Sequence, residues 1–256
     1  MAAMQIIYQP KGPAAEYAPL ACNLYRGCTF GCRYCYGPAS MRKSPQAYFA
    51  DPDPKHNAAE RLMRDLCRMS GDDLLDDRHE ILLSFIGDPY QPAEAQAGLT
   101  RRALRMLAWH GANFTVLTKA GQIVRRDFDY LSSPKARLGV SLVWCCDDDN
   151  RRHWEPGAAP VKERIALLES AKKRGIRTWV SMEPVINPEQ CLRLIRDIAP
   201  LVDEWRVGKL NHFAQVTKMV DWRGFKEQAQ ELLEMAGAKY TFKNSLKMEG
   251  GIDAGK

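Results

Sequence analysis

The sequence lacks any long hydrophobic run. No stretch of about 18 consecutive apolar residues occurs in its 256 residues, so we expect no transmembrane helix. The N-terminal segment MAAMQIIYQPKGP also lacks an apolar core of the length that a secretory signal peptide requires. We therefore expect a protein that is not exported and not embedded in a membrane, with a cytoplasmic location.

A strong excess of one charge is also missing. The chain has 37 basic and 31 acidic residues, which gives a formal net charge of +6. Such a small excess permits an anionic partner but does not require one. The hydrophobic content of 45% is ordinary for a globular protein, and the length suits one large domain or two small ones.

Cysteine is the residue type whose placement is most informative. An exported protein could pair its eight cysteines as four disulfides. This chain is long, has no export signal, and places three cysteines within the segment Cys28–Cys35. That pattern favours thiols that bind a metal or react in a reducing compartment.

Apolar, strand-like runs alternate along the chain with stretches of helical periodicity. We predict strands at residues 21–25, 81–86, 113–119, 136–144, 177–185 and 204–210, with a closing strand at 240–246. Helices are predicted at residues 93–111, 126–131, 161–174, 188–198 and 222–236.

Six strand–helix units predict an α/β fold with a partial (β/α)6 TIM-like barrel, and a doubly wound open sheet is the alternative. The expected organisation is a single core domain over residues 1–248 that includes an N-terminal extension (1–20), followed by a disordered tail (249–256). Chemistry in such folds lies beyond the carboxyl ends of the strands. The cysteine segment and Gly87-Asp88 follow predicted strands, and Lys119 and Glu183-Pro184 lie at the carboxyl ends of two others.

The three cysteines have the spacing C-x3-C-x2-C. Structural zinc usually takes four ligands, arranged as pairs, and no second pair with the usual spacing exists, although a remote cysteine or histidine could serve. Cys145 and Cys146 are adjacent, so we expect their side chains to point in opposite directions on a strand. A [4Fe-4S] cluster is the alternative: three thiolates would leave one iron open to a small ligand.

This motif, with Tyr34 before its last cysteine, resembles that of the radical SAM superfamily. The resemblance to its spore photoproduct lyase-like (DNA repair photolyase) group extends roughly from residue 5 to residue 246. It includes NLYRGCTFGCRYCYGP, DPYQPAE, TKAGQIVRRDFDYL, GVSL, EPGAAPVKERIALLESAKKRGI and VGKLN. It implies a radical SAM enzyme with a [4Fe-4S] cluster that cleaves S-adenosylmethionine (SAM) to a 5′-deoxyadenosyl radical. It also implies a reducing partner such as a flavodoxin or ferredoxin.

The resemblance assigns roles to nine residues. It implies cluster ligation by Cys28, Cys32 and Cys35, and contact of Tyr34 with the adenine. The Gly87-Asp88 turn would bind the methionyl amine of SAM. Lys119 and Ser141 would contact the SAM carboxylate and ribose, and Tyr36 matches a hydrogen-transfer tyrosine.

Structural roles are the alternative for several of these residues. Asp88 precedes a proline and could simply start a turn. Ser141 could bond a neighbouring backbone group, and Lys119 could be a solvated strand end.

One departure from the lyase concerns its hydrogen-donating cysteine. The corresponding place is Phe85-Ile86, which has no thiol, so we do not expect thymine-dimer repair. Cys145 or Cys146 could replace that thiol, although burial as small apolar side chains is the favoured role.

The substrate is less constrained. The pairs Arg125-Arg126 and Arg151-Arg152, with Arg26 and Arg33, could form a basic rim for phosphates, and Trp144 and Trp154 could stack a base. Solvated arginines are the alternative. A nucleic acid, a peptide and a small molecule all remain open. A non-catalytic, zinc-stabilised adaptor that binds nucleic acid is the competing functional hypothesis.

Overall fold

The main sheet has eight strands. The computed structural model describes residues 5–50, 52–83, 85–146, 148–210 and 213–247. The strand order is β1-β2-β5-β6-β7-β8-β9-β10. The bounds are β1 (Ile7–Tyr8), β2 (Leu20–Cys22), β5 (Ile81–Leu83), β6 (Phe114–Thr118), β7 (Ala136–Ser141), β8 (Thr178–Val185), β9 (Glu204–Lys209) and β10 (Lys239–Phe242); a separate pair is formed by β3 (Tyr25–Arg26) and β4 (Asp53–Pro54).

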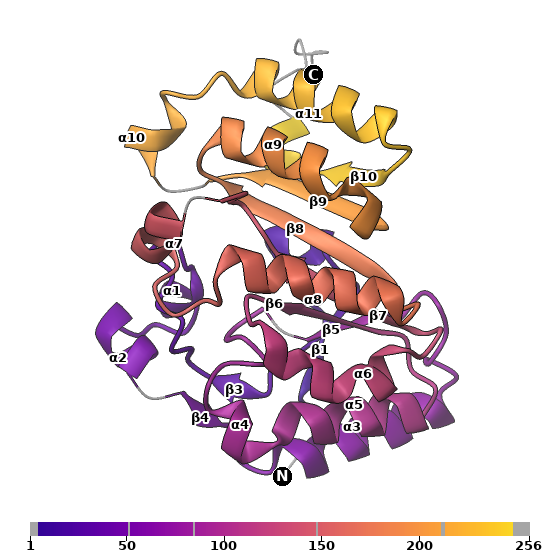
Figure 1. Cartoon of the computed structure of the whole chain (residues 1–256). Coiled ribbons are helices and arrows are strands. Elements are labelled where there is room, and N and C mark those ends of the chain that lie inside the picture. The colour runs from indigo at the N-terminus through magenta and orange to yellow at the C-terminus, as the bar shows by residue number, and fades with distance from the viewer. Residues whose placement is uncertain (1–4, 51, 84, 147, 211–212, 248–256) are drawn as a thin grey trace, which may run out of the picture.

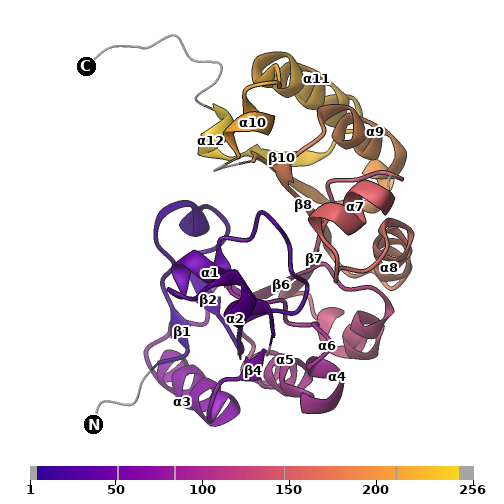
Figure 2. The ribbon, with the colours of Figure 1, turned by 90° about the vertical axis from the view of Figure 1, so that its left-hand side faces the viewer.

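The strands from β2 to β10 in this sheet pair in parallel, and β1 adds antiparallel to β2. The order is linear, so the sheet curves without closing. Figure 2 shows the strands as an arc with the larger helices along its outer side. The prediction of a partial TIM-like barrel is therefore confirmed.

Helices connect the strands and cover the outside of the arc (Figure 1). The α-helices are α1 (Gly37–Ser40), α2 (Pro45–Ala50), α3 (Ala58–Gly71), α4 (Glu94–Ala97), α5 (Leu99–Trp109), α6 (Phe128–Leu131), α7 (Asp148–Trp154), α8 (Val161–Lys173), α9 (Pro188–Ile198), α10 (Ala214–Thr217), α11 (Trp222–Met235) and α12 (Asn244–Lys247). Three 3-10 helices are η1 (Gly12–Glu16), η2 (Gln122–Asp127) and η3 (Ala199–Leu201). No helix of the described residues is long and apolar enough to cross a bilayer.

Local signals explain where the outer helices begin. The side chain of Asn187 accepts a hydrogen bond from the backbone N–H of Gln190 at 3.1 Å, and Pro188 is the first residue of α9. Asp221 caps α11 in the same way through Gly224 at 2.9 Å. Such caps satisfy backbone donors that have no partner within the helix.

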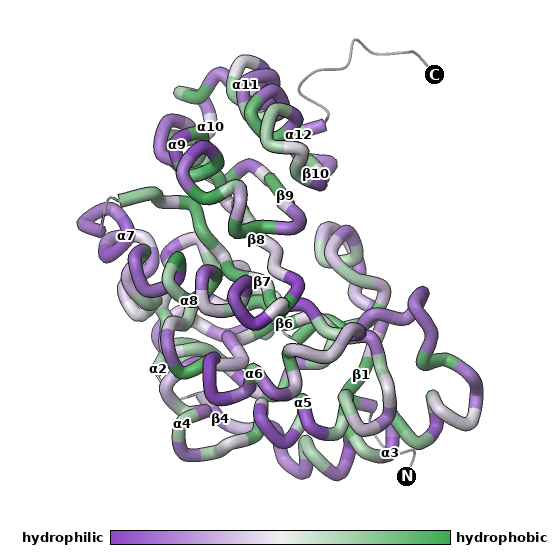
Figure 3. The backbone as a smooth tube through the Cα atoms, turned by 45° about the vertical axis from the view of Figure 1, so that its right-hand side comes forward, coloured by the Kyte–Doolittle hydropathy of each residue, from purple (hydrophilic) through white to green (hydrophobic). Residues whose placement is uncertain are grey.

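Two hydrophobic clusters lie on the two faces of the sheet. The large one packs the outer helices on the strands, and in Figure 3 these helices alternate hydrophobic and hydrophilic residues while β8 is mainly hydrophobic. The small cluster contains Tyr17, Ala18, Leu82 and Trp179. Gly139 makes room for Trp179, because a Cβ there would lie 2.2 Å from the indole.

Residues 12–17 bridge the open side of the arc. Lys243 donates from Nζ to the carbonyl oxygen of Pro13 at 2.8 Å, and the backbone N–H of Asn244 donates to Glu16 at 2.8 Å. The hydroxyl of Tyr17 lies 2.9 Å from that of Ser181 in β8. Part of the predicted N-terminal extension is thus tied to the last strands of the sheet.

Several predicted elements differ in extent. The strand predicted at 21–25 is split between β2 and β3, and the one at 81–86 ends at Leu83. The cause is Asn23, whose side-chain oxygen accepts from the backbone N–H groups of Phe85 and Ile86 and so replaces ladder hydrogen bonds.

Other predicted bounds also changed. The strand at 136–144 ends at Ser141, and the closing strand ends at Phe242 before α12. The helix predicted at 93–111 is broken at Gly98, which has a φ of +57°. Helix α3 was not predicted, and the predicted tail 249–256 lies outside the described residues.

Candidate active site

The three cysteines lie in the loop between β3 and α1, at the carboxyl side of the sheet. Cys28 and Cys32 are buried and Cys35 is partly buried. Two of the sulfurs accept backbone hydrogen bonds: Gly37 donates to Cys35 at 3.3 Å, and Asp88 donates to Cys28 at 3.4 Å. Amide donors aimed at sulfur are the surroundings that cluster-binding thiolates use, so the donor chemistry fits an iron–sulfur cluster.

Burial is the main influence on these thiols. It raises the pKa of Cys28 to about 12, and it also raises the pKa values of Cys32 and Cys35. A metal ion would reverse this effect, because a coordinating thiol is deprotonated outright. Among the described residues, no group of three or more His, Cys, Asp or Glu side chains is arranged to hold a metal ion. Ligation by the three cysteines therefore stays a prediction.

Two glycines allow the cysteine loop to approach the loop after β5. Gly27 and Gly87 have φ angles of +88° and +82°. A Cβ on Gly87 would lie 2.5 Å from the carbonyl oxygen of Gly27, and a Cβ on Gly27 would lie 2.5 Å from that of Tyr48. A larger residue at position 87 would separate the two loops, and one at position 27 would push the cysteine loop away from Tyr48 in α2.

The carboxylate of Asp88 is held by three donors. The Thr118 hydroxyl and the Tyr90 backbone N–H donate to Oδ1 at 2.6 and 2.9 Å, and the Lys119 backbone N–H donates to Oδ2 at 2.7 Å. Burial nevertheless raises the pKa of Asp88 above its ordinary value, while these bonds oppose the rise. The structural alternative for Asp88 thus has direct support, and one lone-pair position remains for a ligand.

A second carboxylate, Glu155, organises the opposite side of the loop. The Tyr34 hydroxyl donates to Glu155, and Arg164 donates to its other oxygen at 2.6 Å. Burial would raise the pKa of Glu155, but the charges of Arg164 and Lys119 lower it overall, with help from these hydrogen bonds. Lys119 places its ammonium 5.6 Å from the centre of the Tyr34 ring.

Sequence reasoning missed Glu155 as a site residue. The signal was the EPG of residues 155–157, which lies inside a stretch that resembles the family. Gly157 packs on the cysteine loop, where its N–H donates to the carbonyl oxygen of Phe30 at 2.9 Å. The sequence spacing of the motifs does not predict that Glu155 accepts a hydrogen bond from Tyr34, which is 121 positions away.

The remaining predicted residues lie around the same region. Ser141 is buried at the end of β7, and its carbonyl oxygen accepts from Arg164 at 2.8 Å. Tyr36 is 49% exposed, and its hydroxyl donates to the carbonyl oxygen of Phe85 at 2.8 Å. Neither placement tests the SAM or hydrogen-transfer roles that the resemblance implies.

Three of the six arginines of the predicted basic rim are already in ion pairs, namely Arg126, Arg151 and Arg152. Arg126 binds Glu94 and Asp127, and Arg151 is buried and donates to the carbonyl oxygens of Glu155 and Ala158. Trp144 is 1% exposed, so it is not available to stack a base. Of that set, Arg26, Arg33 and Arg125 stay exposed and form no ion pair with the described residues.

The expectation for the adjacent cysteines was wrong. Cys145 and Cys146 follow the end of β7, so strand alternation does not apply, and their sulfurs lie 3.3 Å apart. Cys145 is buried and donates to the side-chain oxygen of Gln190 at 2.8 Å, whereas Cys146 is exposed.

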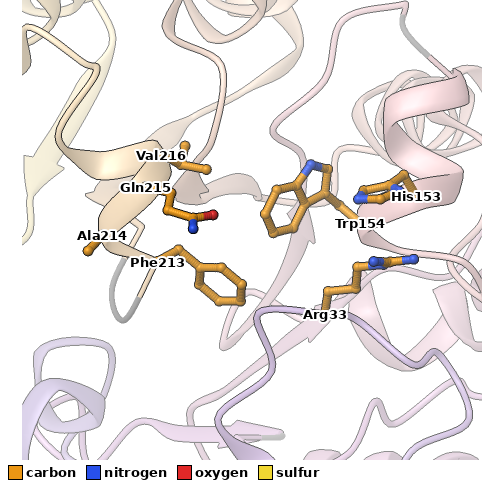
Figure 4. A pocket seen from close by; sticks show the side chains of 7 residues that line it. All are labelled: Arg33, His153, Trp154, Phe213, Ala214, Gln215 and Val216. Atoms are coloured by element: carbon orange, nitrogen blue, oxygen red, sulfur yellow. The ribbon is translucent and has the colours of Figure 1, made fainter.

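A pocket of about 450 Å³ adjoins the cysteine loop. Figure 4 shows Phe213 and Gln215 on one side of it and Arg33, His153 and Trp154 on the other. The backbone N–H of Arg33 donates to the carbonyl oxygen of Trp154 at 2.9 Å, which joins this wall to the cysteine loop.

Comparison with known sequences identifies relatives that extend beyond this chain. No family model matches the sequence. The chain is 29% identical over 177 residues to an uncharacterised protein of Mycobacterium tuberculosis, covering 64% of this chain and 48% of that protein. It is 26% identical over 180 residues to one of Methanocaldococcus jannaschii, covering 69% and 62%. The chain thus spans about half the length of the first of these relatives.

Solved structures give a clearer result for the fold. Spore photoproduct lyase complexed with dinucleoside spore photoproduct matches with a TM-score of 0.70 at 13% identity, over 92% of this chain and 80% of that one. Streptococcus suis SuiB bound to S-adenosylmethionine gives 0.66 at 15%, over 90% and 51%. A radical SAM methyltransferase from Sphaerobacter thermophilus gives 0.56 at 18%, over 90% and 67%. The chain has the fold of the radical SAM proteins.

Proposed function

We propose that this chain is a radical SAM enzyme of the spore photoproduct lyase-like group. The observation that carries the proposal is the position of Cys28, Cys32 and Cys35. They lie on one short loop at the carboxyl side of a sheet that has the radical SAM fold. A [4Fe-4S] cluster bound there would supply the electron that cleaves SAM to a 5′-deoxyadenosyl radical.

The residues of the chain would hold and shield the reactants. Asp88 keeps one lone-pair position on Oδ2 for the methionyl ammonium, because its other bonds are fixed. Lys119, beside Tyr34, offers a positive charge to the methionyl carboxylate. The Tyr34 ring, oriented through Glu155, would lie by the adenine, and Ser141 by the ribose. The cofactor chemistry needs this positioning and the exclusion of water.

Tyr36 would take part in hydrogen transfer, and a reducing partner such as a flavodoxin or ferredoxin would supply the electron. The eight free cysteines suit a reducing compartment, which supports a cytoplasmic location. A nucleic acid is the substrate class that we favour.

Anaerobic reconstitution with iron and sulfide tests the proposed function. We expect a brown protein with about four irons per chain, which forms 5′-deoxyadenosine from SAM when dithionite is added. A colourless, air-stable protein that binds one zinc and leaves SAM intact would instead support the zinc-stabilised adaptor.

A further inference from the structure

The pocket beside the cysteine loop combines aromatic walls with one exposed cation. The rings of Trp154 and Phe213 meet edge to face, with their centroids 5.4 Å apart, and those of His153 and Trp154 are 5.6 Å apart. The volume of about 450 Å³ is large enough for a flat ring system and a substituent. Flat heteroaromatic rings are the ligands that stack on such side chains.

The positive charge of Arg33 favours a ligand that carries a negative charge. Arg33 is exposed, lines the pocket, and forms no ion pair with the described residues, unlike Arg126 and Arg151 on the same side of the fold. A guanidinium presents donors in a fixed fork that matches the oxygens of a phosphate. The amide of Gln215, across the pocket in Figure 4, can donate and accept hydrogen bonds at the edge of a ring.

The walls of the pocket are directly connected to the cysteine loop. Arg33 lies between Cys32 and Tyr34 in the sequence, and its backbone N–H is bonded to the carbonyl oxygen of Trp154. Glu155, which follows Trp154 in the sequence, accepts a hydrogen bond from the Tyr34 hydroxyl. A ligand held by Arg33 and Trp154 would therefore rest on the residues that position the proposed cofactors.

We propose that this pocket binds one unstacked nucleotide unit, with the base on the aromatic side chains and its phosphate at Arg33. This inference deepens the proposed function, on which it rests for the role of the ligand as substrate. An aromatic side chain of a peptide would fill the same walls but would leave Arg33 without an anion. Because a base and phosphate can come from a free nucleotide or from a strand, the test includes both.

The test is calorimetric titration of the anaerobically reconstituted protein. The probes are thymidine monophosphate, thymidine, an eight-residue oligo-dT strand, the same strand in a duplex, and a short peptide containing tryptophan. We expect thymidine to bind at least fivefold more weakly than its monophosphate. Tighter binding of the single strand than of the monophosphate would identify a strand as the source, and equal binding a free nucleotide.

Variants assign the binding to this pocket. Phe213→Ala should weaken binding of the monophosphate at least fivefold, since base stacking on an aromatic side chain has about that value. Arg33→Gln should reduce binding of the monophosphate to the level of thymidine. The matched controls Trp109→Ala and Arg105→Gln change an exposed aromatic residue and an exposed arginine on α5, and they should leave binding unchanged.

Absence of nucleotide binding up to millimolar concentration would overturn the inference, as would peptide binding that is tighter than nucleotide binding. Equal affinities of the wild type and Arg33→Gln for the monophosphate would do the same. If Phe213→Ala does not fold, the Arg33→Gln result decides. Iron content and 5′-deoxyadenosine formation are measured on the same samples, so failure of the nucleotide site is distinguished from failure of the proposed radical chemistry.

Discussion

The carboxylate of Asp88 accepts a hydrogen bond from the backbone N–H of Lys119, with 2.7 Å between the two atoms. This bond joins the loop after β5 to the end of β6. The Thr118 hydroxyl and the Tyr90 N–H complete the set of donors to the same carboxylate. Asp88 is thus an organising residue of the site whether or not it contacts SAM.

The two roles of Asp88 can be separated. Thr118→Val removes one hydrogen bond to a carboxylate and should lower the free energy of unfolding by about 1.5–3 kcal/mol, with less than a fivefold change in the Kd for SAM. Asp88→Asn also loses the negative charge that is proposed to bind the SAM ammonium, so it should weaken SAM binding at least tenfold. Urea unfolding and calorimetric titration measure the two effects. A Kd unchanged in Asp88→Asn would leave this residue with a structural role only.

Cys32→Ala should abolish cluster binding, because two thiolates do not hold a cubane that normally has four. Iron analysis and the visible absorption spectrum after reconstitution measure the loss. Cys67→Ala is the matched control, since Cys67 is exposed on α3, outside the cysteine loop. Full iron content in Cys32→Ala would contradict the assignment of Cys32 as a ligand.

Gly87→Ala should disrupt the contact between the two loops. An alanine there has an unfavourable positive φ and a Cβ only 2.5 Å from the Gly27 carbonyl oxygen. Gly98→Ala has the same backbone penalty, about 1–2 kcal/mol, but its Cβ meets no atom within 4 Å. Both variants should have a lower Tm, and Gly87→Ala alone should lose iron content. Equal iron content in the two variants would mean that the close approach is unnecessary.

Glu155→Gln should be strongly destabilising. Arg164 and Glu155 are both fully buried, so the substitution leaves the Arg164 charge without a countercharge, at a cost of about 3–5 kcal/mol. Asp129→Asn is the control: it breaks an exposed pair with Arg174 and should cost about 1 kcal/mol or less. Urea unfolding curves give the free energy of unfolding of both variants. Similar losses would show that the buried pair stabilises the fold no more than the exposed pair does.

The lowered pKa of Glu204, at the amino-terminal side of the sheet, predicts that stability depends on pH. Arg206 and Arg137 hold its pKa below the ordinary value of 4.5, although burial opposes them. The ionised form is therefore favoured by folding, so the stabilisation is complete above pH 4.5 and is lost as the pH falls through the folded-state pKa. Glu204→Gln should be less stable than the wild type at pH 7, with the difference shrinking towards pH 3. A difference independent of pH in urea unfolding would refute this account.

Much of the fold was determined by the sequence alone. Alternating apolar runs and amphipathic helices predicted six parallel strands near their observed positions, because burial of one face is a local, periodic requirement. The C-x3-C-x2-C spacing likewise placed Cys28, Cys32 and Cys35 on one loop at the carboxyl side of the sheet. These features depend on neighbours in the chain, which a sequence shows directly.

Only the tertiary structure decided which distant residues meet. The pairing of Tyr34 with Glu155, the bridge from Pro13 to Lys243, and the burial of Trp144 all depend on how the sheet curves. The closeness of the Cys145 and Cys146 sulfurs depends on where β7 ends. Residues far apart in sequence are joined by packing and hydrogen bonds that leave no periodic signal, which is why the pocket lined by Trp154 and Phe213 could not be predicted.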